Sequence, residues 1–424
     1  MNVSDSEVVA SILKDAGYVT VHSYGQADLI LVNTCAIRDN AEQKIRNRLD
    51  VFRQEKKKRP QLLIGIIGCM AERLKEKLLE EVKSLDLVVG PDAYRDLPNL
   101  LKTAGSGQQA MNVMLSMEET YADISPVRLD KNKVSSFVSI MRGCNNMCAY
   151  CIVPYTRGGE RSRDAGTILR EVQELSDMGY KEVTLLGQNV DSYDWNGVSF
   201  AELLSRVAGI NPLLRVRFST SHPKDMSEEV LYAMARYDNI CKSIHLPVQS
   251  GSSSVLQRMK REYTREWYLE KIASIRRILP EATLSTDLIA GFCGETEEEH
   301  QETLSLIQEV RYDLAFMFKY SERPKTYASR HYQDDVPEEV KGRRLQEIID
   351  LQNVISAEVK KQDLGKTVEV LAEGFSKKSR EELFGRTSQN RVVVFPREQY
   401  HAGDYVRVLV TGSTPATLLG KVVE

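Results

Sequence analysis

Three cysteines lie close together on one short stretch of the chain, residues 143–151. They are Cys144, Cys148 and Cys151, and their spacing is C-x-x-x-C-x-x-C. Thiolates spaced in this way can hold three corners of a 4Fe–4S cube, which leaves the fourth iron open to bind a substrate or cofactor. A zinc loop is the alternative, although a closed zinc site needs a fourth ligand, usually from a second cysteine pair. The spacing therefore favours an iron–sulfur centre with one open position.

The composition is that of a globular protein without a membrane segment. The 424 residues, 42% hydrophobic and 28% charged, should form two or three domains. The net charge of −3 gives no global signature of nucleic-acid binding, so any RNA surface must be local. The longest apolar run, residues 62–71, is too short to span a bilayer, and we recognise no signal peptide. The seven cysteines, an odd number, do not suggest a set of disulfides. Because thiolates that bind iron must stay reduced, we expect a cytoplasmic protein.

The N-terminal part alternates short apolar runs with charged, helix-like stretches. We expect strands at 28–33, 62–68 and 85–90 and helices at 40–58, 71–83 and 93–102. This pattern predicts an open α/β domain over residues 1–104, in which ligands bind beyond the carboxyl ends of the strands. Cys35 and Cys69 each follow such an end, so they could meet on one edge of the sheet.

A second series of strands and helices follows residues 104–134, which we expect to form a linker. Its six candidate strands are 136–141, 182–187, 214–219, 242–246, 283–288 and 313–319. Regular β/α alternation predicts a partial, parallel (β/α)6 barrel over residues 130–361, with its chemistry on the loops at the carboxyl face. The cysteine-rich loop follows the first of these strands, as this rule requires.

The C-terminal part changes pattern again. A charged helix is expected at 337–361, and residues 366–424 alternate apolar and polar side chains between Gly, Ser and Pro turns. This alternation predicts a small antiparallel β-barrel over residues 362–424. The whole chain is therefore expected to be an α/β protein of three units.

Several short stretches resemble those of the radical S-adenosylmethionine (SAM) methylthiotransferases. The resemblance covers nearly the whole chain and includes the aromatic Tyr150 before the last cysteine of the cluster loop. Asn-Thr-Cys-Ala-Ile-Arg, residues 33–38, is most similar to the branch that acts on dimethylallyladenosine in tRNA, whereas the ribosomal-protein branch usually has Gly-Phe after this cysteine. The remaining stretches are 68–70, 139–144, 153–158, 185–190, 246–251 and 320–324.

The resemblance implies a radical SAM barrel, a C-terminal TRAM domain and two 4Fe–4S clusters. One cluster, on Cys144, Cys148 and Cys151, would bind SAM and cleave it to a carbon radical, with an electron donor such as flavodoxin or ferredoxin. The auxiliary cluster, on Cys35 and Cys69, would supply sulfur. The family has a further auxiliary cysteine in Gly-Cys-Gln-Met-Asn, and this chain starts at what matches the final Met-Asn. We expect a shortened start, with a cluster-deficient variant as the alternative.

The implied reaction is methylthiolation at carbon 2 of N-isopentenyladenosine beside the anticodon, so the implied partner is a tRNA anticodon stem-loop. Three alternatives remain open from the sequence. The substrate could instead be threonylcarbamoyladenosine in tRNA or a ribosomal protein. The chain could also be an RNA-binding homologue that lacks sulfur transfer.

Polar residues after the first two barrel strands are candidates for contact with SAM. A guanidinium fork matches the SAM carboxylate, although an ordinary salt bridge is an equal alternative. The second strand ends in Gly-Gln-Asn, where related enzymes hold the amino end of SAM; a plain turn is the alternative. The expected SAM-contacting residues are Tyr150, Arg157, Arg163, Gly187, Gln188 and Asn189.

The other candidates carry weaker signals. His222 and His245 lie near carboxyl ends of strands and could act as bases or simply be structural. Cys241 is expected in the core, and Cys293 stands where the family usually has proline, as a free cysteine or a cluster ligand. A local basic patch in the last domain suits contact with RNA phosphates, with a solvated hairpin as the alternative. Its residues are Lys377, Lys378, Arg380, Arg386 and Arg391.

Overall fold

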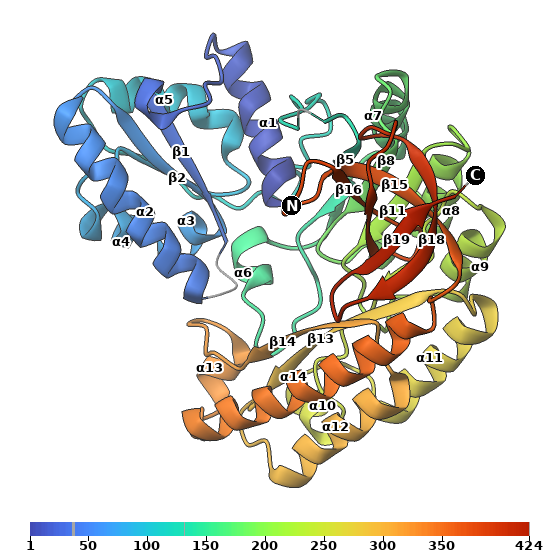
Figure 1. Ribbon diagram of the computed structural model, residues 1–424. Helices are drawn as coiled ribbons and strands as arrows, with labels where there is room; N and C mark the ends of the chain where they lie inside the picture. Colours follow the sequence, from blue (N-terminus) through green and yellow to red (C-terminus); the bar gives the residue numbers. More distant parts are fainter. Residues whose placement is uncertain (36–38, 131, 424) are drawn as a thin grey trace.

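The computed structural model describes residues 1–35, 39–130 and 132–423, without the side chains of residues 39–42. Residues 36–38 of the Asn-Thr-Cys-Ala-Ile-Arg stretch lie outside this description. Figure 1 shows three units in chain order: a sheet domain in blue, a larger barrel in green to orange and a small barrel in red. The predicted fold class is confirmed, whereas the limits 1–104, 130–361 and 362–424 stay predictions.

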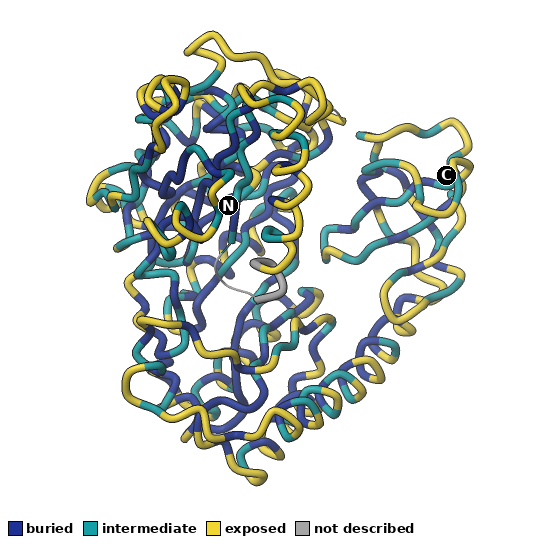
Figure 2. Tube along the Cα trace, turned by 90° about the vertical axis from the view of Figure 1, so that its left-hand side faces the viewer, coloured by how far each residue is buried: buried dark blue, intermediate teal, exposed yellow. Residues whose placement is uncertain are grey.

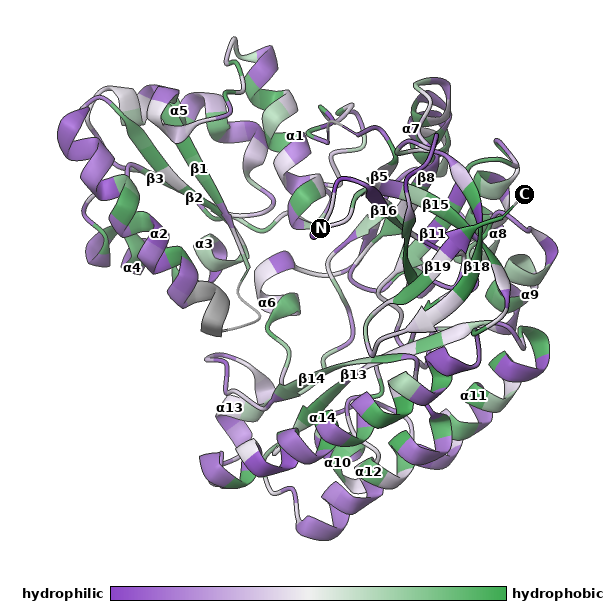
Figure 3. Ribbon diagram, viewed as in Figure 1, coloured by the Kyte–Doolittle hydropathy of each residue, from purple (hydrophilic) through white to green (hydrophobic). Residues whose placement is uncertain are grey.

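The N-terminal unit is a parallel sheet of order β1-β2-β3-β4. Its strands are hydrophobic along their length because helices cover both faces (Figure 3). The strands are β1 (Leu29–Thr34), β2 (Leu63–Gly68), β3 (Leu87–Val89) and β4 (Ala110–Asn112). The helices are α1 (Asn2–Asp15), α2 (Asp39–Lys58), α3 (Cys69–Leu74), α4 (Glu76–Glu81) and α5 (Leu97–Gly105), with short 3₁₀ turns η1 (Tyr24–Gln26) and η2 (Tyr94–Asp96).

Three features of this unit differ from the sequence-based expectation. The stretch expected as a linker contributes β4, which pairs with β3. The single helix expected over 71–83 is divided into α3 and α4 because Lys75 has a φ of 51°, outside the helical range. Helix α1 was not predicted, because its apolar residues are few and its packing partners are distant in sequence.

The central unit contains all six expected barrel strands, each parallel to its neighbour. The strands run in the order β5-β8-β11 and β12-β13-β14, and a parallel bridge from Val216 to Ile240 joins the two halves. The outer strands are therefore β5 and β14, as expected of a partial barrel. The strands are β5 (Ser135–Ser139), β8 (Glu182–Leu186), β11 (Arg215–Ser219), β12 (Ser243–His245), β13 (Thr283–Ala290) and β14 (Leu314–Lys319).

Helices alternate with these strands, and the longer ones pack on the outside of the barrel. They are α6 (Val153–Arg157), α7 (Ala165–Asp177), α8 (Phe200–Ala208), α9 (Glu228–Arg236), α10 (Ser253–Arg258), α11 (Arg265–Ile278), α12 (Glu297–Val310), α13 (Tyr327–His331) and α14 (Glu338–Lys361). Short pieces complete the unit: β6 (Met141–Arg142) pairs with β7 (Arg161–Ser162), β9 (Asp194–Trp195) with β10 (Val198–Ser199), and η3 (Val190–Ser192) follows β8. None of the helices in the described ranges is long and apolar enough to cross a membrane.

The C-terminal unit is a closed five-stranded barrel of order β15-β16-β17-β19-β18. Its pairings are antiparallel, as expected, except that β17 and β19 are parallel. Figure 2 shows that its strands, near the C-terminus, have a buried interior of their own. The strands are β15 (Thr367–Phe375), β16 (Glu382–Arg386), β17 (Val392–Pro396), β18 (Tyr405–Ser413) and β19 (Leu418–Val422).

The turn between β16 and β17 docks on the amino end of the large barrel. Glu182, the first residue of β8, is buried and accepts from Arg217 at 2.6 Å and from Arg386 at 3.1 Å. Arg217 also donates to the carbonyl of Thr387 at 2.7 Å, and Thr283 donates to the carbonyl of Gln389 at 2.7 Å. The small barrel therefore closes the end of the large barrel that lies opposite the carboxyl ends of its strands.

Replacing Arg217 with Met should destabilise the protein by about 3 kcal/mol, because it removes one of two cations that neutralise a buried carboxylate. Urea denaturation of the metal-free protein measures this. Arg206→Met is the matched control, because Arg206 forms an exposed pair with Glu202 and should cost less than about 0.5 kcal/mol. Equal midpoints for the two variants would contradict the proposed role of the docking contact.

Candidate functional site

The cysteine loop follows β5 and β6 and is fixed by backbone hydrogen bonds. The Cys144 N–H donates to the Gly158 carbonyl at 3.1 Å, and the Cys151 N–H donates to the Cys148 carbonyl at 3.0 Å. Gly143 has a φ of +75°, and a Cβ there would lie 1.9 Å from the Gly159 carbonyl oxygen, so only glycine fits. These contacts hold the cysteines on one loop at the carboxyl side of the barrel.

The thiols of this loop are partly or fully buried and lie near enough to affect one another. Burial, with a smaller contribution from the neighbouring Cys148, raises the pKa of Cys144 to about 11. Burial and the charge of Cys148 raise the pKa of Cys151 to about 12. The metal-free site therefore holds these two as neutral thiols, and binding of iron must displace their protons.

Arg261 is a buried cation beside this loop that sequence reasoning missed. Its guanidinium donates to Cys148 Sγ at 3.2 Å, to the Tyr263 hydroxyl at 2.9 Å and to the Pro247 carbonyl at 2.7 Å. Among the described residues, no carboxylate lies within ion-pair distance of it. A buried guanidinium without a carboxylate partner favours a bound anion at this point. The sequence offered one signal for Arg261: it follows the carboxyl end of the fourth barrel strand, where residues of the site are expected.

Cys35 and Cys69 follow neighbouring strands of the N-terminal sheet. The parallel register pairs Thr34 with Gly68, so the next residue of each strand is a cysteine at the same edge. Gly68 has a φ of +92°, and a Cβ on it would lie 2.8 Å from the Thr34 carbonyl oxygen. Cys69 is buried and opens α3, where Arg157 Nε donates to its sulfur at 3.1 Å.

Arg157 belongs to a buried ion-pair network between the N-terminal unit and the cluster loop. Asp5 accepts from Arg157 at 2.7 Å and from Arg142 at 2.8 Å, and Asp92 accepts from Arg161 at 2.7 Å. Burial alone would raise the pKa of Asp5, but the two guanidinium groups lower it to about 2. Three buried guanidinium groups thus face two carboxylates, and one of them, that of Arg157, also donates to the sulfur of Cys69.

Short helix α6 joins the two groups of cysteines. It begins two residues after Cys151 and ends at Arg157, whose guanidinium reaches Cys69. Ile152, next to Cys151, also packs against Cys69 in a small buried cluster. The cysteines of the N-terminal sheet and those of the barrel therefore lie at two ends of one short connection, and Figure 1 shows α6 between these units.

The predicted SAM-contacting arginines already have partners. Arg157 binds Asp5 and Cys69, and buried Arg163 forms an ion pair with Glu171 on α7. Their contact with SAM stays a prediction. The ion pairs that they form agree with the alternative, in which each arginine makes an ordinary salt bridge. Tyr150 packs edge-on against Phe292, 6.4 Å between ring centroids, below the cluster loop.

The Gly-Gln-Asn stretch follows β8; Gly187 and Asn189 are buried and Gln188 is half-buried. Asn189 donates to Asp225 at 2.6 Å and accepts from the His222 N–H at 3.1 Å. A Cβ on Gly187 would lie 2.5 Å from Met141 Cγ, so the chain passes close to β6 here. Gln188 Oε1 is buried and has no hydrogen-bond partner among the described residues, so it offers an acceptor for a cationic group.

The other candidate histidines and cysteines have neighbours within the fold. Burial lowers the pKa of His222 to about 2, which makes it a poor base near neutral pH. His245 contacts Ser285 Oγ at 3.0 Å and lies 3.6 Å from a carboxylate oxygen of Asp287. Cys241 is buried, as expected of a core residue. Cys293 is also buried, and it packs under the cluster loop with neighbours that include Phe292 and Tyr320.

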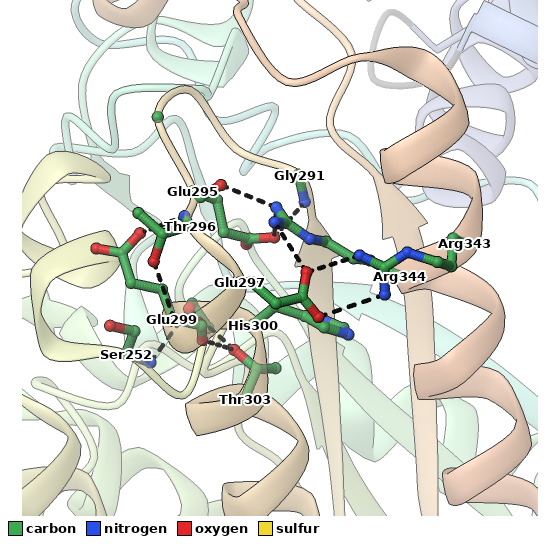
Figure 4. Close-up of polar contacts among 12 residues, drawn as sticks. Ser252, Gly291, Glu295, Thr296, Glu297, Glu299, His300, Thr303, Arg343 and Arg344 are labelled. Carbon is green, nitrogen blue, oxygen red and sulfur yellow. Dashed lines mark hydrogen bonds and ion pairs between the residues drawn. The ribbon is translucent and has the colours of Figure 1, made fainter.

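One histidine and two carboxylates on α12 and α14 are residue types that could bind a metal ion, but here they belong to an ion-pair network. Glu297, His300 and Glu347 lie close enough to share an ion. Arg343 donates to Glu297 and to Glu347, both at 2.6 Å, and Arg344 approaches Glu297 at 3.3 Å. Figure 4 shows both guanidinium groups directed at Glu297. Two cations at the carboxylates disfavour a metal ion there.

The predicted RNA-binding patch is divided between two locations. Arg386 pairs with Glu182, and Arg391 pairs with Asp313 at 2.6 Å and with Asp363, so both hold the two barrels together. Lys377, Lys378 and Arg380 are exposed on the loop between β15 and β16. The three exposed residues are the part of the patch that can reach phosphates.

Each of the three units is matched by a known protein family. Residues 138–307 match the radical SAM superfamily, residues 1–90 match the uncharacterized protein family UPF0004, and residues 361–423 match the TRAM domain. A protein of Parabacteroides distasonis named tRNA-2-methylthio-N(6)-dimethylallyladenosine synthase is 58% identical over 100% of this chain and 93% of its own length. The chain belongs to the family of tRNA-2-methylthio-N(6)-dimethylallyladenosine synthases. Family members of the same name from Phocaeicola vulgatus and Chloroherpeton thalassium are 60% and 57% identical, each over 99% of this chain and 93% of their own length.

Solved structures support the fold. The radical S-adenosylmethionine methyltransferase TsrM from Kitasatospora setae has a TM-score of 0.58 at 13% identity, covering 85% of this chain and 75% of that chain. The cobalamin-dependent S-adenosylmethionine radical enzyme OxsB has a TM-score of 0.54 at 15% identity, covering 82% of this chain and 53% of that chain. At these identities the likeness shows the fold alone.

The residues present fit the cofactors that the family implies, 4Fe–4S clusters and SAM. The Cys144, Cys148 and Cys151 loop supplies three thiol ligands and leaves one position of a cluster open. The unpartnered Gln188 oxygen suits the SAM amino group, and the Arg261 guanidinium suits its carboxylate. Cys35 and Cys69 supply two thiol ligands for the auxiliary cluster at the sheet edge.

Replacing Asp5 with Asn should destabilise the metal-free protein near neutral pH. Because its pKa is lowered from 3.8 to about 2, the Asp5 carboxylate contributes stability that is fully present above about pH 4 and lost as the pH falls through about 2. This contribution amounts to about 2 kcal/mol.

Urea denaturation from about pH 5 downward measures the effect. The difference between the natural protein and Asp5→Asn should narrow as the pH falls toward 2. Asp50→Asn is the control, because Asp50 forms an exposed pair with Arg53 at 3.8 Å. A difference that stays constant over this range, or equal behaviour of the two variants, would show that Asp5 does not carry the interface.

Proposed function

We propose that this enzyme methylthiolates carbon 2 of N(6)-dimethylallyladenosine in tRNA by radical SAM chemistry. The identity of 58% over the whole chain to relatives named for this product carries the proposal. Three cysteine ligands on a loop at the carboxyl end of an open parallel barrel support it. The proposal includes an anticodon stem-loop as the bound RNA, a cytoplasmic location and a flavodoxin or ferredoxin as electron donor.

When bound, the cluster supplies the electron that splits SAM and so provides a radical able to take hydrogen from the adenine C–H bond. The chain has to hold SAM in one orientation. Gln188 and Arg261 bind the amino and carboxylate ends of its methionine part. Because Arg261 and the side-chain oxygen of Gln188 are both buried, water is kept from the methionine part of SAM.

The N-terminal unit provides the sulfur site. Cys35 and Cys69 hold the auxiliary cluster, and Arg157 donates a hydrogen bond to the sulfur of Cys69. Helix α6 fixes the spacing between this site and the SAM site. Lys377, Lys378 and Arg380 on the C-terminal barrel bind RNA phosphates.

The reaction is tested by expressing the gene in a bacterial strain that lacks its own methylthiotransferase for prenylated tRNA. Mass spectrometry of the digested tRNA should show the 2-methylthio derivative of dimethylallyladenosine. Cys148→Ala should abolish it, whereas Cys241→Ser changes a cysteine remote from the loop and should retain it. Methylthiolation of threonylcarbamoyladenosine alone, or of neither nucleoside, would reject the proposed substrate.

The role of Arg261 predicts a specific loss of SAM affinity. Arg261→Gln should weaken binding of SAM to the oxidised, reconstituted protein about tenfold or more, because it removes the charged partner of the carboxylate. Arg261→Lys should recover only part of this loss, since an ammonium group lacks the bidentate fork.

Equilibrium dialysis with labelled SAM measures these affinities. Arg258→Lys is the matched control, because Arg258 ends helix α10, three residues before Arg261, and already pairs with Glu299 at 2.6 Å. Natural SAM affinity in Arg261→Gln would remove this residue from the SAM site.

A further inference from the structure

Three large apolar side chains are exposed on the inner face of the open barrel. On β5, Ser136 and Val138 are buried against the helices, so Phe137 between them faces the opposite way and is 36% exposed. On β14, Ala315 is buried in the core, whereas Leu314 and Phe316 alternate with it and are 47% and 45% exposed. We call Phe137, Leu314 and Phe316 the inner apolar strip.

The inner apolar strip lies on both outer strands of the barrel. The strand order places β5 at one end of the series and β14 at the other, so the strip flanks the open side. An isolated exposed apolar residue is ordinary, but two phenylalanines and a leucine on the inward faces of two edge strands are not. The strip therefore needs an apolar occupant that can enter from the side of the barrel.

One of the two strands that carry the strip, β5, leads to the cluster loop. Phe137 lies on β5, and the chain continues from β5 through β6 directly to Cys144. The side of Phe316 contacts His245, with ring centroids 5.7 Å apart at 81°. A ligand bound to the strip thus lies in the interior of the barrel, on the amino side of the cluster loop.

We propose that the inner apolar strip binds the dimethylallyl chain of the target adenosine. In adenine, carbon 2 and carbon 6 both flank N1, so the N6 substituent lies on the same edge of the base as the reacting carbon. A base placed with carbon 2 toward the cluster must therefore accommodate its N6 chain close by. A branched hydrocarbon chain gains free energy by covering exposed aromatic and leucine side chains.

The apolar character of the strip disfavours the other modified adenosine. Asp287 pairs in register with Phe316, and its carboxylate lies 3.6 Å from His245 Nε2, so it has a partner of its own. The N6 substituent of threonylcarbamoyladenosine ends in a carboxylate, and covering this charge with apolar side chains that cannot pair with it costs free energy. The strip thereby selects the prenylated base over the threonylcarbamoylated one. This inference rests on the proposed function and names the residues that set its specificity.

Two synthetic anticodon stem-loops test the inference, one with dimethylallyladenosine and one with plain adenosine at the same position. Fluorescence anisotropy on the anaerobically reconstituted enzyme, with SAM and without reductant, gives the ratio of their dissociation constants. Phe316→Ala and Phe137→Ala should each lower the preference for the prenylated RNA about tenfold and leave affinity for the plain RNA unchanged. Phe316→Leu should keep most of the preference, because it remains apolar.

Tyr232→Ala is the matched control, since Tyr232 is a 52% exposed ring on the outer helix α9. An unchanged ratio in both alanine variants, with the natural enzyme still preferring and modifying the prenylated RNA, would overturn the inference and leave the proposed function standing. A natural enzyme without this preference would overturn the inference, and one that also leaves the prenylated RNA unmodified once reductant is added would overturn the proposed function. A change in molar mass by light scattering in the alanine variants, with the RNA ratio unchanged, would assign the strip to contact between two copies of the chain and would also overturn it.

Discussion

The buried pairing of Asp5 with Arg142 and Arg157 is the contact on which the arrangement of the site depends. It joins the first helix of the N-terminal unit to residues on either side of the cluster loop. Because buried ion pairs are stable only when their geometry is fixed, the pairing restrains the rotation of the two units. Arg157 extends the restraint to Cys69. The distance between the sulfur-bearing edge of the sheet and the SAM-binding loop is therefore set by one short helix and one guanidinium group.

The large barrel is closed at one end and open at the side. Its amino end is covered by the β16–β17 turn, where Arg217 and Arg386 share Glu182. Its open side lies between β5 and β14, where the inner apolar strip is exposed. A radical reaction on a base within a large RNA needs these two properties together, because the base must enter from outside while solvent must be kept from the reacting carbon. The C-terminal barrel thus has two roles, as a cover for the large barrel and as a carrier of exposed lysines.

Much of the fold could be predicted from local sequence, because parallel strands buried on both faces give continuous apolar runs. The six barrel strands and the cysteine loop follow from such runs and from spacing alone. Strand β4 and helix α1 could not be predicted, since each is stabilised mainly by distant partners. Arg386 and Arg391 look like members of one basic patch in the sequence, yet each pairs with a carboxylate of the other barrel. Likewise, Arg261 resembles any surface arginine until the fold buries it beside Cys148.

The central claim is that the cluster on the three-cysteine loop has an open iron that SAM occupies. Electron paramagnetic resonance of the reduced, reconstituted enzyme, recorded with and without SAM, tests this most directly. We expect the signal of the loop cluster to change its g-values when SAM is added, and to be missing from the variant with alanine at Cys144, Cys148 and Cys151. A signal that does not respond to SAM, or one that persists unchanged in the triple variant, would contradict the account.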